Sequence, residues 1–181
     1  MSETARISRG RIGLLAWVLA HGGGRQAGSG PLTLFLTLGR HRKLFRGWIR
    51  FAGRLMPGGQ LPRRDAELVI LRVAQLRSCT YEHAHHVRIG RRAGLSAGDI
   101  DRVAAGPDAP GWTPHQQLLL RAVDELHDTR DLSDATWSAL RDELSETDCI
   151  ELCMLVGHYE MLATTIAALR IPPDPPRGRV A

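Results

Sequence analysis

Acids, a thiol and imidazoles are concentrated between residues 61 and 92. On a helical wheel of about 100° per residue, Cys79, Glu82 and His86 fall on one side of the second half of this segment. In the first half, Glu67 falls on the apolar side. A carboxylate on a face expected to be buried is uncommon unless it is paired or functional. The cluster therefore predicts a site for acid–base or thiol chemistry.

Three further side chains are candidates for the same pocket. His83 shares the side of Cys79, and Tyr81 is expected at the pocket rim or against a neighbouring subunit. His158 shares a helical face with Glu151 and apolar residues, so it is either a second imidazole facing the site or a core histidine bonded to a carbonyl. We expect no metal, because the spacing of these histidines matches neither a H-E-x-x-H motif nor a Cys/His zinc pattern. No organic cofactor is expected either.

The elements that must position these residues are helices. Apolar residues recur at helical spacing, no alternating β-strand is evident, and capping signals mark most boundaries. We expect N-caps at a hydroxyl between Ser78 and Thr80, at Ser96, at Thr113 and at Ser133. The predicted helices cover residues 32–38, 44–55, 62–77, 80–93, 96–105, 113–128, 133–144 and 145–171. The fold class is all-α, and two helix–turn–helix units leave room for an internal duplication.

The ends of the chain differ in composition from the middle. Arginines precede an apolar run at residues 12–20, which favours a short first helix over an export signal because a small-residue cleavage site is missing. The Gly-rich segment from His21 to Pro31 predicts a loop or linker. We therefore expect residues 1–31 to form a helix and linker, residues 32–170 one helical domain, and residues 171–181 a disordered Pro/Arg tail.

Charge and cysteine content set limits on partners and compartment. The formal charge is +5, but the arginines are scattered along the sequence, so basicity alone predicts neither nucleic-acid nor membrane binding. Three irregularly spaced cysteines do not form a disulfide framework and suit a reducing compartment, so the expected location is the cytoplasm. Leu- and Ala-rich helices with few aromatics favour a homo-oligomer.

The segments R-D-A-E-L-V-I-L-R-V-A (64–74), C-T-Y-E-H-A-H-H (79–86) and R-A-G-L-S (92–96) resemble the carboxymuconolactone decarboxylase and alkylhydroperoxidase D superfamily. The resemblance extends over roughly residues 32 to 170 and implies the helical alkylhydroperoxidase D-like fold. In the hydroperoxidase branch a glutamate, a Cys-x-x-Cys pair and a histidine relay protons. Residue by residue, this implies Glu67 as the glutamate, Cys79 as the first cysteine and His86 as the histidine.

The second cysteine of that motif is replaced here by Glu82. In the family this thiol attacks peroxide and the first one resolves it, so a dithiol cycle within the motif is excluded. Attack by Cys79 alone would leave a sulfenic acid that needs an external thiol reductant. With a second carboxylate instead, Glu67, Glu82 and His86 form an acid–base group, because two carboxylates in one pocket do not both ionise cheaply.

Three functions follow as hypotheses. The first is a decarboxylase-like enzyme that moves protons at a small organic substrate through the two glutamates and the histidine. The second is a peroxiredoxin-like activity of Cys79 with a Glu67/His86 relay. The third is a non-catalytic helical protein that binds a small ligand or a partner.

Overall fold

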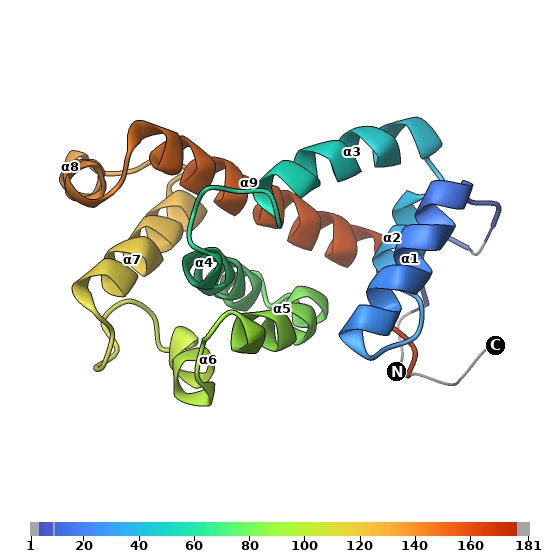
Figure 1. Ribbon diagram of the computed structural model, residues 1–181, viewed down its shortest axis with the longest axis horizontal. Helices are drawn as coiled ribbons and strands as arrows, with labels where there is room; N and C mark the ends of the chain where they lie inside the picture. The colour runs from blue at the N-terminus through green and yellow to red at the C-terminus, as the bar shows by residue number, and fades with distance from the viewer. Residues whose placement is uncertain (1–3, 9, 177–181) are drawn as a thin grey trace. The chain divides into compact units, whose positions relative to one another are not determined.

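The computed structural model describes residues 4–8 and 10–176 and is all-α over that part of the chain (Figure 1). Its described residues form nine helices and no strand, apart from an isolated bridge between Ser29 and Pro176. The helices are α1 Leu14–Ala27, α2 Thr33–Leu38, α3 Arg42–Leu55, α4 Arg63–Leu76, α5 Thr80–Arg92, α6 Ala97–Val103, α7 Pro114–Asp128, α8 Asp134–Glu143 and α9 Glu146–Leu169. The predicted fold class is confirmed.

The chain divides into two compact units. Unit 1 contains residues 1–53 and 165–181, and unit 2 contains residues 54–164. All the candidate site residues belong to unit 2, which is described first.

Helix α4 is the central element of unit 2. Ten consecutive residues, Asp65–Ala74, are buried, and the helix packs against α5, α6 and α7. Its apolar side chains share a core with those of the neighbouring helices. Arg72 is also buried: its guanidinium donates to both carboxylate oxygens of Asp124 at 2.7 and 2.8 Å and to the Val103 carbonyl at 2.7 Å. A helix buried over ten residues and tied to α7 by the Arg72–Asp124 ion pair is a rigid support for a site.

The structure confirms most of the predicted N-caps. Ser96 and Thr113 each form a capping box with the residue three positions later. The Ser133 side chain accepts from the Thr136 amide at 3.2 Å. Gly94 adopts φ +96° just after α5, the left-handed conformation in which glycine is favoured.

The turn before α5 differs from its prediction. The N-cap is Cys79, no side chain caps the helix, and Ser78 adopts the left-handed φ of +49°. The expected hydroxyl cap was therefore wrong. This tight turn leaves the thiol of Cys79, instead of a hydroxyl, at the start of the helix, and thereby brings it into the first turn of α5 beside Glu82.

In unit 1 the Gly-rich segment is not a linker. Helix α1 continues through the three glycines to Ala27 and ends at Gly28, which has φ +69°. Gly24 is buried against the backbone of Gly30, where a Cβ atom would collide with the carbonyl group. Close backbone packing, and not flexibility, explains glycine at that position.

The part of the tail that the structure describes is also held in place. Asp174 accepts from the Thr33 amide at 2.8 Å and so caps the first turn of α2, and the Gly30 amide donates to the Pro175 carbonyl at 2.7 Å. The predicted disorder was therefore wrong for residues 171–176; residues 177–181 lie outside the described part.

Helix α9 is long and apolar enough to cross a membrane by length and composition alone. Within unit 2, however, it supplies buried core residues such as Leu152 and Leu155. Of its most apolar window, 44% is buried.

Candidate acid–base site

Glu67 is fully buried in the middle of α4 and is paired on both oxygens. Its Oε2 accepts from Nδ1 of His86 at 2.7 Å. Its Oε1 lies 2.9 Å from Nη2 of Arg63, one turn earlier on the same helix. A buried carboxylate is costly unless it is paired, and these two contacts supply the pairing.

The reach of His86 to Glu67 depends on how closely α5 approaches α4. Gly90, one turn after His86, is the residue of closest approach: a Cβ atom there would lie 2.9 Å from a methyl of Leu95 and 3.6 Å from Cβ of Glu67. The missing side chain lets the two helices pack closely. His86 itself is buried, and because Nδ1 is directed to Glu67, Nε2 is the nitrogen left for proton exchange.

Cys79 and Glu82 form the second half of the site, at the start of α5. Both are buried, and the thiol lies against the Glu82 carboxylate, whose charged form it favours. Among the described residues no nitrogen or oxygen donor hydrogen bonds with either oxygen of Glu82. The Glu82 carboxyl group is therefore buried without the ion pair and histidine contact that Glu67 has.

Burial raises the pKa of Glu82 to about 8, and the negative charge of Glu160 adds to this increase. Burial likewise raises the pKa of the Cys79 thiol to about 11, with a further contribution from Glu82. The amides of Glu82 and Tyr81 at the helix start act in the opposite direction and are outweighed. At neutral pH the pair thus holds its protons: a carboxylic acid beside a thiol.

Tyr159 of α9 joins the two histidines of the site. Its buried ring stands edge-on to His86 at 5.0 Å and to His158 at 5.2 Å between centroids. Burial, and then the nearby Glu67 and Glu82, raise its pKa well above the usual value, so the phenol stays protonated. His158 is buried too, and desolvation followed by the neighbouring His86 lowers its pKa to about 4. His158 is therefore a neutral imidazole at neutral pH.

The two remaining sequence candidates lie apart from this group. The Tyr81 ring contacts His85 at 4.9 Å between centroids, and the half-buried His83 side chain makes no described polar contact. Four of the candidates are thus brought together in two pairs, Glu67 with His86 and Cys79 with Glu82.

Three residues of the site were missed in the sequence. Arg63 is one helical turn from Glu67, a spacing that signals an ion pair. Tyr159 adjoins a candidate histidine, but nothing in the sequence indicates its central position. Glu160 carries the charge that acts on Glu82, and its own pairing with His127 at 2.6 Å and Arg77 at 3.4 Å is a tertiary feature that spacing does not reveal.

Glu160 also borders a cavity of about 280 Å³ between α7 and α9. The cavity is lined by Leu126, His127, Arg130, Cys153, Val156, Gly157 and Glu160. Gly157 contributes no steric bulk, since an added Cβ atom would meet nothing within 4 Å. Glu160 therefore lines this cavity and also acts through its charge on the buried Glu82. Among residues 4–8 and 10–176, no group of three or more His, Cys, Asp or Glu side chains is arranged to hold a metal ion.

Comparisons with known proteins agree with this fold and motif. Residues 42–125 match the carboxymuconolactone decarboxylase family, a range that contains both pairs of the site. This segment is similar to that family, and the fold is that of alkylhydroperoxidase D-like proteins. No curated protein matches it significantly.

Solved structures show the same fold at low sequence identity. A peroxidase-related protein with an alkylhydroperoxidase D core, from Ralstonia eutropha, has a TM-score of 0.81 at 18% identity and covers 93% of this chain and 92% of its own. A peroxidase-related protein from a Silicibacter species has a TM-score of 0.79 at 14% identity, over 93% and 91%. A debrominase has a TM-score of 0.72 at 15% identity, over 88% and 86%.

Proposed function

We propose that this protein is an enzyme that transfers protons to and from a small organic substrate without a metal or organic cofactor. Glu82 acts as the general acid, and His86, oriented by Glu67, acts as the general base. The observation that carries the proposal is the contrast between two buried glutamates, one paired with a histidine and an arginine and the other protonated beside the Cys79 thiol. Environments that separate the protonation states of two groups are what acid–base catalysis needs.

The roles follow from the contacts. Glu67 fixes the His86 ring through Nδ1 and stabilises its imidazolium once Nε2 has taken a proton. Arg63 holds the other oxygen of Glu67 in an ion pair. Tyr159 fills the space beside the His86 ring and keeps water from it. Glu82 delivers the proton that the product requires, and its raised pKa makes that donation efficient near neutral pH.

The substrate class is a small cyclic compound with an acidic carbon–hydrogen bond or a carboxylate to lose. The family name supports carboxylated lactones. The debrominase among the structural relatives was crystallised with 2,3,4-tribromopyrrole, which supports small planar rings as well.

The test is a panel of carboxylated lactones, β-keto acids and halogenated pyrroles, with carbon dioxide release and solvent deuterium incorporation followed by NMR. We expect Glu82→Gln and His86→Asn each to lower turnover about 10²- to 10⁴-fold. The control Glu146→Gln removes an exposed glutamate of α9 and leaves turnover unchanged. Full turnover by both site variants would contradict the proposal.

A peroxidase is the second candidate, favoured by the peroxidase-related structural relatives and by the Cys79–Glu82 contact. The raised pKa of Cys79 disfavours the peroxidase function, because the thiolate is the species that attacks peroxide. Peroxide consumption with an external thiol donor, compared between the native chain and Cys79→Ser, separates the two functions. Proton-transfer turnover that survives Cys79→Ser supports the acid–base function; peroxide turnover that disappears with it supports the thiol function.

A further inference from the structure

Unit 1 has a charge that the whole-chain composition conceals. Residues 1–53 and 165–181 contain 12 of the 24 Lys and Arg residues but only 2 of the 19 Asp and Glu residues. The formal charge of unit 1 is therefore +10 and that of unit 2 is −5. Such a division of charge within one chain is typical of proteins that meet a polyanionic surface.

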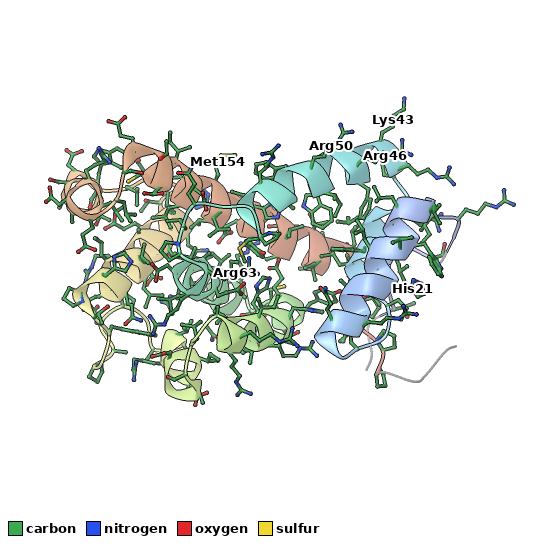
Figure 2. All side chains as sticks on the ribbon, viewed as in Figure 1. His21, Lys43, Arg46, Arg50, Arg63 and Met154 are labelled. Atoms are coloured by element: carbon green, nitrogen blue, oxygen red, sulfur yellow. The ribbon has the colours of Figure 1, made fainter. Side chains whose placement is uncertain are left out.

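The cations are presented by α3. Lys43, Arg46 and Arg50 are exposed at helical spacing, and Figure 2 shows their side chains projecting from one side of the helix. None of the three forms an ion pair with a described residue. Leu44, beside them, is 63% exposed. Unpaired cations along one helix face remain available for an anionic partner.

Helix α1 has its large apolar side chains on the outside. It buries only Ala16, Ala20 and Gly24, whereas Leu14 is 78% and Trp17 is 50% exposed. The exposed face, which also contains Leu15 and Val18, is therefore more apolar than the buried one. A soluble helix normally has the reverse pattern, and an exposed contiguous apolar face marks a contact site.

The two helices adjoin at their starts within unit 1. The start of α1 lies at the start of α3, where a Cβ atom on Gly13 would be 3.5 Å from Cγ of Arg42. An apolar helix with a tryptophan, next to a row of lysine and arginine, combines the two attractions of an anionic lipid surface: insertion of apolar side chains and neutralisation of headgroups. Nucleic acid would use the cations but would leave Leu14, Leu15 and Val18 exposed to water.

We propose that unit 1 is a docking surface for anionic lipid bilayers, formed by the apolar face of α1 and the cationic face of α3. The inference replaces the expectation from scattered arginines that the chain has no membrane contact. It is independent of the reaction proposed for unit 2, because none of the site residues belongs to unit 1.

The experiment is co-sedimentation of the full chain with vesicles of phosphatidylcholine, with and without about 30% phosphatidylglycerol. We expect binding to the anionic vesicles, loss of binding at high salt, and affinity about tenfold or more weaker for Arg46→Gln/Arg50→Gln. Trp17→Gln should weaken binding as well. The native chain should show a blue shift of its tryptophan emission on vesicles, and this variant should lack it. All three substitutions are at exposed positions, so folding, checked by circular dichroism, is expected to be retained.

Matched controls are available in unit 2. Trp137→Gln removes a tryptophan of similar exposure, 43%, from α8, and Arg91→Gln/Arg92→Gln removes two exposed arginines from the end of α5. Both controls should bind vesicles like the native chain. Equal binding to neutral and anionic vesicles, or equal weakening by controls and unit 1 variants, would overturn the proposal. So would binding to a DNA duplex but not to vesicles, or a dimer that Trp17→Gln dissociates and that does not bind vesicles.

Discussion

The chemistry of the site depends on which residue occupies one position, Glu82. A cysteine there would complete a dithiol motif with Cys79, whereas the carboxyl group accepts a hydrogen bond from the thiol and, once ionised, opposes ionisation of the thiol by its negative charge. The thiol in turn is the polar neighbour that favours the ionised carboxylate. Each group therefore controls the proton of the other, and both protons are retained at neutral pH.

This coupling predicts the reactivity of Cys79 without knowledge of the substrate. Above the Glu82 pKa of about 8, Glu82→Gln removes a negative charge beside the thiol, so the pKa of Cys79 falls and alkylation at a fixed pH in that range becomes faster, by about threefold or more. The rate of iodoacetamide modification is measured against pH in a Cys153→Ser background, which removes the one cysteine that is not buried. An unchanged or slower rate in the variant, with Glu146→Gln as control, would mean that the carboxyl group does not act on the thiol.

Much of the site could be predicted from the sequence. The motif selected Glu67, Cys79 and His86 from their spacing on two consecutive helices, which is local information, and the structure pairs Glu67 with His86 and Cys79 with Glu82. Tyr159 and Glu160 could not be found in this way, because they come from a helix some seventy residues later and their contacts depend on tertiary packing. The raised pKa of Glu82 has the same origin, since spacing does not reveal desolvation.

At the scale of elements, α4 is held by its internal ion pair. Replacing Arg72 by Met leaves Asp124 unpaired and is expected to lower the free energy of unfolding by about 3 kcal/mol. Urea denaturation followed by circular dichroism measures the loss. The double variant Arg72→Met/Asp124→Leu should recover most of it, because it removes both charges. A double variant no more stable than Arg72→Met would contradict the role assigned to the pair.

A second contact joins α4 to two other helices through His115 at the start of α7. The ring donates from Nδ1 to Glu143 at 2.6 Å and from Nε2 to Asp65 at 3.0 Å. Two carboxylate acceptors require the imidazolium form. Although burial acts in the opposite direction, the hydrogen bonds to these carboxylates raise the pKa of His115 above 6.5.

Because the folded-state pKa is raised, the stabilisation by His115 is complete below about pH 6.5 and is lost as the pH rises through the folded value. His115→Gln should therefore destabilise the protein at about pH 5.5 and much less at about pH 9, by up to about 1 kcal/mol because the ring is partly exposed. Urea midpoints of the native and variant chains at the two pH values measure this difference. A loss that is equal at both values would exclude the charged form as its cause.

Element boundaries were predictable where a side chain or a glycine marks them, as at Ser96, Thr113 and Gly94. They were not predictable where close packing overrides local preference. Gly24 lies inside a helix because another backbone segment approaches it, and Asp174 orders a proline-rich segment because it caps α2. Both effects join residues that are distant in the sequence or have no local signal.

At the scale of the whole molecule, charge and chemistry are divided between the two units. The buried acid–base site belongs to the acidic unit 2, and the exposed apolar and cationic faces belong to unit 1. Variants of one unit should therefore leave the properties of the other unchanged. Trp17→Gln and Arg46→Gln/Arg50→Gln are expected to give the same alkylation rate of Cys79 as the native chain. A changed rate would show that the two units do not act separately.

The central claim is that Glu82 is a protonated carboxylic acid at neutral pH. An NMR titration of the native chain with ¹³C-labelled glutamate side chains tests it most directly, with the Glu82 resonance assigned by its absence in Glu82→Gln. We predict that this resonance titrates with a pKa near 8, as burial and the charge of Glu160 require. Titration of Glu82 in the ordinary range, near 4.3, would contradict the proposed acid and with it the acid–base mechanism.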